Sequence, residues 1–143
     1  MSLYNVFNIT GTGMSAQSVR LNTTASNLAN AQSVASSVNE TYKARHPVFA
    51  EMLTDGFLKE REGVFDTNGG VEVLGIVESK APYNLRYEPH HPMADDKGFV
   101  TYPNVNVVEE MTNMISASRS FQMNVELMNT AKTLAQRVLS LGQ

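Results

Sequence analysis

Charged side chains are concentrated in the middle of this chain and are almost absent from its two ends. Residues 1–39 hold a single charged side chain, Arg20, and residues 111–143 hold four, whereas 20 of the 25 Lys, Arg, Asp and Glu residues lie between Glu40 and Glu110. A solvated helix face would normally carry Lys, Glu and Arg, but both ends carry Asn, Thr, Ser and Gln instead. We therefore expect the two ends to be covered by other protein surfaces rather than by water.

Hydrophobic and small residues recur with heptad spacing through the N-terminal end. Alternating intervals of four and three residues place one set of them on a single helix face: Phe7, Gly11, Met14, Ser18, Leu21, Ala25 and Leu28. Large and small side chains alternate along this seam, which allows a second helix to approach closely. The pattern predicts a long N-terminal helix, in which Gly11 is a small seam residue and Gly13 a tolerated neighbour that weakens the helix by about 1 kcal/mol.

A second long helix is predicted at the C-terminal end. Asn106 is a suitable N-cap, Glu109 completes a capping-box pattern, and Gly142 is a suitable stop. Two heptad series follow the cap and together form one wide apolar face, because 3.6 residues per turn make a single seam drift. The first comprises Val107, Met111, Met114, Ser118, Phe121, Val125 and Met128, and the second comprises Leu127, Ala131, Leu134, Val138 and Leu141.

The two predicted helices are expected to form an antiparallel coiled-coil pair, around which further copies pack. Their many Thr, Ser and Asn residues give weak helix propensity, so neither helix is expected to fold alone. An isolated two-helix bundle is the other interpretation of the pattern, but the scarcity of surface charge is unfavourable for a soluble monomer. The buried contacts of the pair are expected to join two sets of side chains: Phe7, Met14, Leu21 and Leu28 with Met114, Phe121, Val125 and Met128.

The central region is predicted to be a small, mostly antiparallel β-module. Pro and Gly interrupt residues 40–103, and strands are expected at 71–78, 83–88 and 99–102, with a less regular fourth candidate at 48–53. The predicted fold class is therefore α+β. Residues 1–39 (helix plus linker) and 104–143 form the axial helical domain, and residues 40–103 form the inserted β-module.

Two short motifs suggest chemistry that their surroundings do not support. Gly11-x-Gly13-x-x-Ala16 has the spacing of a dinucleotide-binding turn, but no buried strand precedes it and the first acidic residue after it is Glu40, which is too distant. The segment 88–96 gathers two His and two Asp residues, but adjacent residues of an extended chain point to opposite faces, whereas zinc needs converging ligands. We expect no cofactor, no metal and no enzyme activity.

Bulk composition excludes several further classes. A net charge of −3 gives no field that would attract nucleic acid, and the absence of Cys removes disulfides and thiolate chemistry. No Sec-type signal opens the chain, and no apolar run reaches the roughly 18 residues of a membrane span. We therefore expect neither nucleic-acid binding nor direct insertion into a membrane.

Several segments resemble bacterial flagellar proteins. The stretches GTGMSAQSVRLN (11–22) and ASNLANA (25–31) are similar to the N-terminal signature of flagellar axial proteins. The resemblance is narrowed to basal-body rod proteins of the proximal rod, FlgC type, by four further stretches: TYKARHPVFA (41–50), HPMADDKGFVTYPNVNVVEEM (91–111), NMISASRSFQ (113–122) and NTAKTL (129–134). The low-complexity segment 32–40 departs from this pattern, so no family geometry is carried onto it.

The resemblance implies a structural subunit of the flagellar rod, which crosses the periplasm and transmits torque from motor to hook. It implies assembly with copies of itself and with other rod proteins through the terminal helices. It also implies export through the flagellar type III apparatus without a cleavable Sec signal. The functional residues are then the seam positions: Phe7, Gly11, Met14, Leu21, Ala25, Leu28, Met111, Met114, Phe121, Val125, Met128, Leu134, Val138 and Leu141. The alternative function is a helical adaptor that binds one partner helix and does not polymerise.

Overall fold

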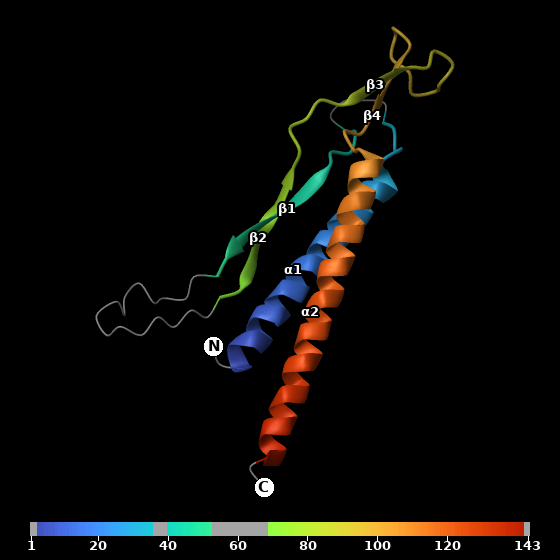
Figure 1. Ribbon diagram of the computed structural model, residues 1–143. Coiled ribbons are helices and arrows are strands. Elements are labelled where there is room, and N and C mark those ends of the chain that lie inside the picture. Colours follow the sequence, from blue (N-terminus) through green and yellow to red (C-terminus); the bar gives the residue numbers. More distant parts are fainter. Residues whose placement is uncertain (1–2, 36–39, 53–68, 142–143) are drawn as a thin grey trace, which may run out of the picture. The chain divides into compact units, whose positions relative to one another are not determined.

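The computed structural model describes residues 3–35, 40–52 and 69–141 (Figure 1). Its elements follow in the order α1 (Leu3–Asn30), β1 (Arg45–Glu51), β2 (Val71–Glu78), β3 (Asn84–Tyr87), β4 (Phe99–Tyr102) and α2 (Val107–Leu141). Two terminal helices thus enclose a small antiparallel β-module in the sequence, and the predicted α+β class is confirmed. The predicted stop at Gly142 lies outside the described residues.

The strands form two separate two-stranded sheets, β1–β2 and β3–β4. Strands β2, β3 and β4 lie where the sequence predicts them. Strand β1 begins three residues before the predicted apolar run, because the Ser79 N–H donates to the Ala44 carbonyl at 2.7 Å and Arg45 is held by the side chain of Asn27. The backbone is therefore already extended before Val48.

The described chain divides into two compact units. The first comprises residues 3–19, 48–52, 69–75 and 116–141, and the second comprises residues 20–35, 40–47 and 76–115. Each helix contributes to both units. In the first unit the Val71 N–H donates to the hydroxyl of Thr12 at 3.3 Å, so α1 contacts the start of β2.

Threonine hydroxyls are bonded back to their own helices. In α1 the Thr10 hydroxyl donates to the Val6 carbonyl at 2.8 Å and Thr12 to Asn8 at 3.0 Å. In α2 the same four-residue pattern occurs at Thr112, Thr130 and Thr133, each at 2.9 Å. This bond satisfies the hydroxyl without solvent or a second helix.

The start of α2 is fixed by the predicted cap. The Val108 N–H donates to the side-chain oxygen of Asn106 at 3.1 Å, and the Glu110 N–H donates to the Asn106 carbonyl at 2.9 Å. Asn106 is therefore confirmed as the N-cap. The Glu109 half of the predicted capping box is not formed within the described residues, where the exposed Glu109 side chain has no hydrogen-bond partner.

The β3–β4 hairpin supplies the most deeply buried side chain of the second unit. Asn84 pairs with Tyr102 and Tyr87 with Phe99, so Val100 opposite Arg86 points to the inner face and is fully buried. Ala35, beyond α1, forms an antiparallel bridge to Thr101 on the other edge of β4. The hairpin is therefore bound on its β4 side by the segment that leaves α1.

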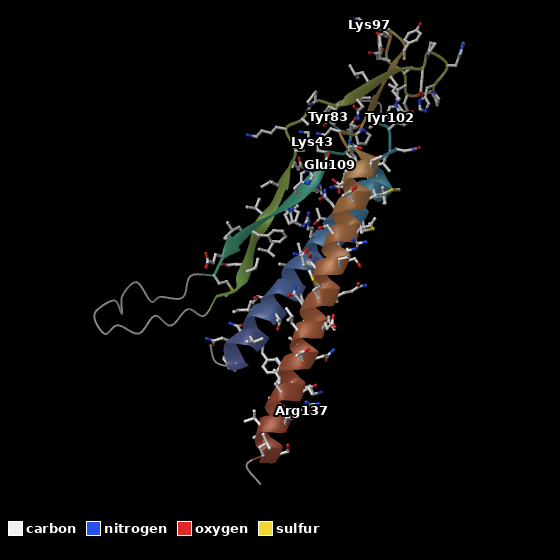
Figure 2. The ribbon with its side chains drawn as sticks, in the orientation of Figure 1. Lys43, Tyr83, Lys97, Tyr102, Glu109 and Arg137 are labelled. Carbon is white, nitrogen blue, oxygen red and sulfur yellow. The ribbon has the colours of Figure 1, made fainter. Side chains whose placement is uncertain are left out.

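Tyr102, which is labelled in Figure 2, forms a polar cluster on the β3–β4 hairpin with Arg86 and Glu88. The Arg86 guanidinium lies 4.4 Å from the centre of the Tyr102 ring, and the Tyr102 hydroxyl donates to the Glu88 carboxylate at 3.1 Å. Desolvation and the Glu88 carboxylate raise the pKa of the Tyr102 phenol, while Arg86 acts in the opposite direction. The phenol therefore stays protonated at neutral pH and remains a donor to Glu88.

The loop between β3 and β4 contains a tight turn at residues 95–98. The Gly98 N–H donates to the Asp95 carbonyl at 2.9 Å, and the Asp95 carboxylate accepts from the Lys97 and Phe99 amides. Gly98 has a φ of 80°, and a Cβ at this position would lie 2.9 Å from the Tyr87 ring. Glycine is required here for both its conformational freedom and its lack of a side chain.

Replacing Gly98 with Ala is expected to lower the free energy of unfolding by about 1–3 kcal/mol, because it adds left-handed strain and a clash. Urea unfolding followed by circular dichroism measures this loss. Gly75→Ala is the matched control, since Gly75 lies in β2 and no neighbouring atom is within 4 Å of the position that an added Cβ would take. A Gly98→Ala protein as stable as Gly75→Ala would contradict the assignment.

Candidate assembly surface

Helix α1 meets α2 with a side of its own that carries mainly small and polar residues. In the first unit, a Cβ on Gly13 would lie 3.1 Å from the Asn124 side-chain nitrogen, and in the second unit the Arg20 guanidinium donates to the Asn113 side chain at 2.9 Å. Later residues of α1 thus meet earlier residues of α2, so the helices run antiparallel. The residues on this side of α1 have their own alternating spacing of three and four: Thr10, Gly13, Gln17, Arg20, Thr24 and Asn27.

The side of α2 that faces inward follows a heptad series that is mostly buried or half-buried. Glu110, Ala117 and Ala131 are buried, and Met114, Phe121 and Met128 are half-buried between them. The predicted positions Met114, Phe121 and Met128 therefore lie on this face. Their predicted companions Met111, Leu134, Val138 and Leu141 are exposed, and Val125 is half-buried.

The predicted seam of α1 lies beside the side that the chain itself buries. Phe7, Met14, Leu21 and Leu28 are half-buried, and Ala25 is exposed. From Gly11 onward, each seam position follows a position on the buried side by one residue, which is about 100° around an α-helix. The apolar residues of α1 are therefore left partly uncovered in the single chain, and their part in an assembly stays a prediction.

The two helical glycines have roles opposite to those expected within the chain. No atom lies within 4 Å of the position that a Cβ on Gly11 would take, whereas Gly13 is in close contact with Asn124. The expectation that Gly13 is only tolerated is wrong, because the absence of a side chain there makes room for Asn124. Gly11 lies on the partly uncovered side with the predicted seam.

One buried side-chain oxygen on each terminal helix lacks a partner in the described part of the chain. Gln17 Oε1 and Glu110 Oε2 are buried, and neither has a hydrogen-bond partner within the described residues. Burying an unpaired polar atom costs about 1–3 kcal/mol. These two oxygens therefore reduce the stability that burial of the two helices supplies.

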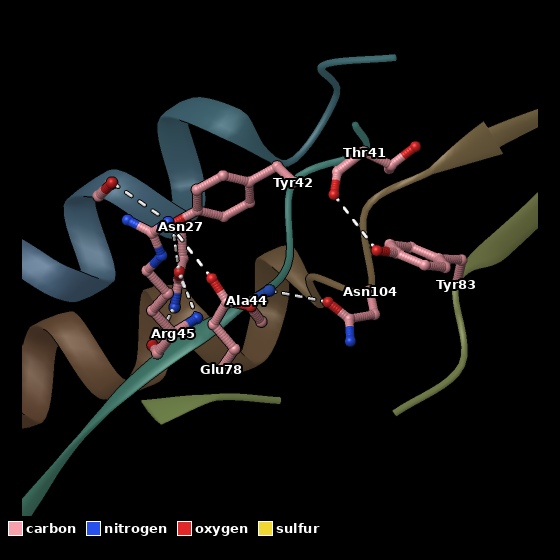
Figure 3. Close-up of polar contacts among 9 residues, drawn as sticks. Asn27, Thr41, Tyr42, Ala44, Arg45, Glu78, Tyr83 and Asn104 are labelled. Carbon is pink, nitrogen blue, oxygen red and sulfur yellow. Dashed lines mark hydrogen bonds and ion pairs between the residues drawn. The ribbon is translucent and has the colours of Figure 1, made fainter. Parts of the chain in front are cut away.

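Asn27 holds the chain after α1 against the helix (Figure 3). Its side chain is 1% exposed, and its Oδ1 accepts from the Tyr42 hydroxyl at 2.8 Å and from the Arg45 N–H at 2.9 Å. Its Nδ2 donates to the Arg45 carbonyl at 2.8 Å. The amide thus bonds both backbone groups of Arg45, as a neighbouring strand would, and all its strong hydrogen-bonding capacity is used except one donor.

Asn104 performs a similar task on the other side of the same segment (Figure 3). Its Oδ1 accepts from the Ala44 N–H at 2.8 Å, and its Nδ2 donates to the Ala81 carbonyl at 2.8 Å. Tyr83 donates from its hydroxyl to the Thr41 carbonyl at 3.3 Å. The backbone from Thr41 to Arg45 is therefore fixed by side chains from three different elements or loops.

Sequence reasoning missed Asn27, Tyr42 and Asn104 as organising residues. The available signal was Asn27, because Asn has poor helix propensity and yet stands within a helical pattern. A buried amide also needs hydrogen-bond partners. Local pattern did not identify those partners, because they lie 15 or more residues further along the chain. The exposed residues His90, Asp95 and Asp96 belong to the loop before β4, and no group of His, Asp and Glu among the described residues could hold a metal ion.

Two family models match the chain over its helices. The model described as "Flagella basal body rod protein" matches residues 7–34, and the model described as "Flagellar basal body rod FlgEFG protein C-terminal" matches residues 96–141. The flagellar basal-body rod protein FlgC of Escherichia coli O6:H1 is 48% identical over 143 residues, with all of both chains covered. FlgC of Salmonella typhimurium is 46% identical over the same full length, and FlgC of Borreliella burgdorferi is 34% identical over 100% of this chain and 99% of its own.

This chain belongs to the flagellar basal-body rod protein family. The resemblance stated from the sequence is thereby confirmed. The matched stretches contain most of α1 and the β4–α2 region, which carry the helix contact and the Asn104 and Asn106 side chains. The relatives are named as flagellar basal-body rod proteins, and neither family model describes an enzyme. Among the described residues, neither helix has the combined length and apolar character of a membrane span.

Asn27→Ala is expected to lower the free energy of unfolding by about 2–4 kcal/mol, because it leaves the Arg45 N–H and the Tyr42 hydroxyl without their buried acceptor. Urea unfolding measures the loss, and hydrogen exchange at the Arg45 amide should accelerate. Asn22→Ala is the control, since Asn22 is an exposed residue of the same helix. Equal stability of the two variants would show that the Asn27 bonds do not hold this segment.

Proposed function

We propose that this chain is a structural subunit of the flagellar basal-body rod and assembles through the apolar sides of its terminal helices. The observation that carries the proposal is the distribution of residues on the helix pair. On α1, small and polar residues occupy the contact within the chain and the large apolar residues lie at its border. On α2, Met111, Leu134, Val138 and Leu141 are exposed. Such a pair is suited to burial among neighbouring subunits.

The energetics favour assembly over folding of the helix pair alone. Phe7, Met14, Leu21 and Leu28 are each half-buried in the single chain, and full burial of such a side chain contributes roughly 1.5–3 kcal/mol relative to exposure. Completing the burial of several side chains per subunit would therefore supply stabilisation that the polar contact between α1 and α2 lacks. The partners we propose are further copies of this chain and other rod proteins.

The mechanical role follows from the same arrangement. Helices packed side by side resist bending and twisting because their interiors are close-packed, so a rod of such pairs would transmit torque from motor to hook. Residues 40–103 would then lie outside the axial domain formed by residues 1–39 and 104–143. The proposal also includes export through the flagellar type III apparatus, a location across the periplasm and no catalytic role.

Leu28→Lys and Phe121→Glu are each expected to abolish incorporation into basal bodies and swimming, because a charge on the seam cannot be buried without a partner. Immunoblots of isolated basal bodies and swimming in soft agar measure the two losses. Leu28→Met and Phe121→Leu keep an apolar side chain of similar volume and should incorporate. Normal incorporation of both charged variants would contradict the seam assignment.

The free subunit distinguishes a rod subunit from an adaptor that binds one partner helix. At micromolar concentration, circular dichroism of the full chain should show much less helix than the 28 and 35 residues of α1 and α2 would give, because the helices depend on neighbours. Helical content should rise when the protein assembles. Full helicity in dilute monomer would favour the adaptor.

A further inference from the structure

Glu110 is a buried carboxylate with an incomplete set of partners. It is 3% exposed, and its Oε2 atom has no hydrogen-bond partner within the described residues. It lies in the first turn of α2, where the helix dipole favours a negative charge. A buried charge is costly unless it is paired, so this carboxylate needs a donor that the described residues do not supply.

Arg20 of α1 contacts α2 one helical turn from this carboxylate, within the same compact unit. Its guanidinium donates to Asn113 Oδ1 at 2.9 Å, and Asn113 follows Glu110 by three residues. Residues three apart are neighbours on one helix face. Arg20 is half-buried and forms no ion pair within the described residues. A cation bonded to a neutral amide therefore lies next to an anion that lacks a partner.

No other charge in the described part of the two helices is placed to neutralise either group. Helix α1 has no acidic residue, and α2 has only Glu109 and Glu126 besides Glu110. Glu109, labelled in Figure 2, is exposed, and Glu126 lies about 20 Å along α2 from the residue that Arg20 contacts. The nearest cation to Glu110 on α2 itself is Arg119, about 13 Å along the helix and exposed.

We propose that Arg20 exchanges Asn113 for Glu110 when the subunit enters the rod, so that a buried ion pair joins α1 to α2 in the assembled state. The inference rests on the proposed function, because neighbouring subunits supply the cause. In the single chain water reaches the half-buried guanidinium, and a neutral acceptor is sufficient. Neighbours that exclude this water make an unpaired guanidinium costly, and a charge-assisted bond to a carboxylate is roughly twice as strong as a bond to an amide.

The exchange needs new side-chain rotamers and no sliding of the helices. Glu110 and Asn113 lie on the same face of α2, so the long Arg20 side chain passes from one to the other across a single turn. The hydrogen bonds of Asn27 to Arg45, which hold the chain after α1, are left intact. One movement pairs both the cation and the buried anion.

Charge removal tests the pair in the full chain, expressed in place of the native gene in the bacterium that carries it. Glu110→Gln and Arg20→Gln should each reduce incorporation into basal bodies about tenfold or more, because each leaves one buried charge without a partner. The double variant R20Q/E110Q has no charge to neutralise and should incorporate better than either single variant. Glu109→Gln is the matched control, since it makes the same change at an exposed neighbour.

Urea unfolding of the free subunit separates the exchange from an ordinary structural role. Because Glu110 has no charged partner before assembly, Glu110→Gln should unfold at the same urea concentration as the unaltered protein, or at a higher one. A lower midpoint would show that the pair already stabilises the free subunit, and would overturn the exchange. A double variant that incorporates no better than the worse single variant would overturn the pairing itself.

The contact can also be observed directly by cryo-electron microscopy of isolated basal bodies that carry the unaltered protein. A guanidinium nitrogen of Arg20 should lie within about 4 Å of a Glu110 carboxylate oxygen in the rod. Arg20 still bonded to Asn113, with Glu110 apart from it, would overturn the proposal, and so would Arg20 paired with an acidic residue of a neighbouring subunit.

The two proposals fail separately. Incorporation of Glu110→Gln at the level of Glu109→Gln, while Leu28→Lys is excluded from basal bodies, would overturn the ion pair and leave the proposed function standing. Normal incorporation of both Leu28→Lys and Phe121→Glu would instead count against the proposed mode of assembly.

Discussion

A buried amide needs hydrogen-bond partners, and in this chain Asn27 finds them in the backbone of Arg45 and the hydroxyl of Tyr42. This interaction fixes the direction in which the chain returns from α1, and strand β1 begins at the residue that Asn27 holds. Asn104 then ties the same segment to the turn before β3 through Ala44 and Ala81. A few side-chain amides thus do what a third strand would do in a larger sheet.

The helix contact shows how a chain can keep its largest apolar residues available. Gly13, Arg20 and Asn27 lie on the buried side of α1, so close approach and hydrogen bonds, rather than apolar burial, define how α1 meets its surroundings. Arg20 is the only charge among residues 1–39, and Asn113 accepts its hydrogen bond. A directional bond of this kind favours one axial position of α1 along α2, which an apolar seam alone specifies weakly.

The sequence predicted elements well because element formation depends on local pattern. The two helices, the Asn106 cap and the strands β2 to β4 follow from periodicity, capping preference and turn residues. The detailed contact was not predictable in the same way. Hydrophobicity selected Leu21 and Leu28, whereas the chain buries Thr24 and Asn27, and periodicity alone does not say which of two adjacent stripes meets the partner helix.

The threonines of both helices have a consequence for neighbouring surfaces. Thr112, Thr130 and Thr133 donate their hydroxyl proton to a carbonyl one turn earlier, as Thr10 and Thr12 do in α1. In the exposed residues Thr112, Thr130 and Thr133 the hydroxyl proton is already used, so the side chain presents its methyl group and hydroxyl oxygen outward. These threonine hydroxyls need no acceptor from a neighbouring helix. A neighbour of different sequence could therefore pack against this surface without leaving a hydroxyl donor unpaired.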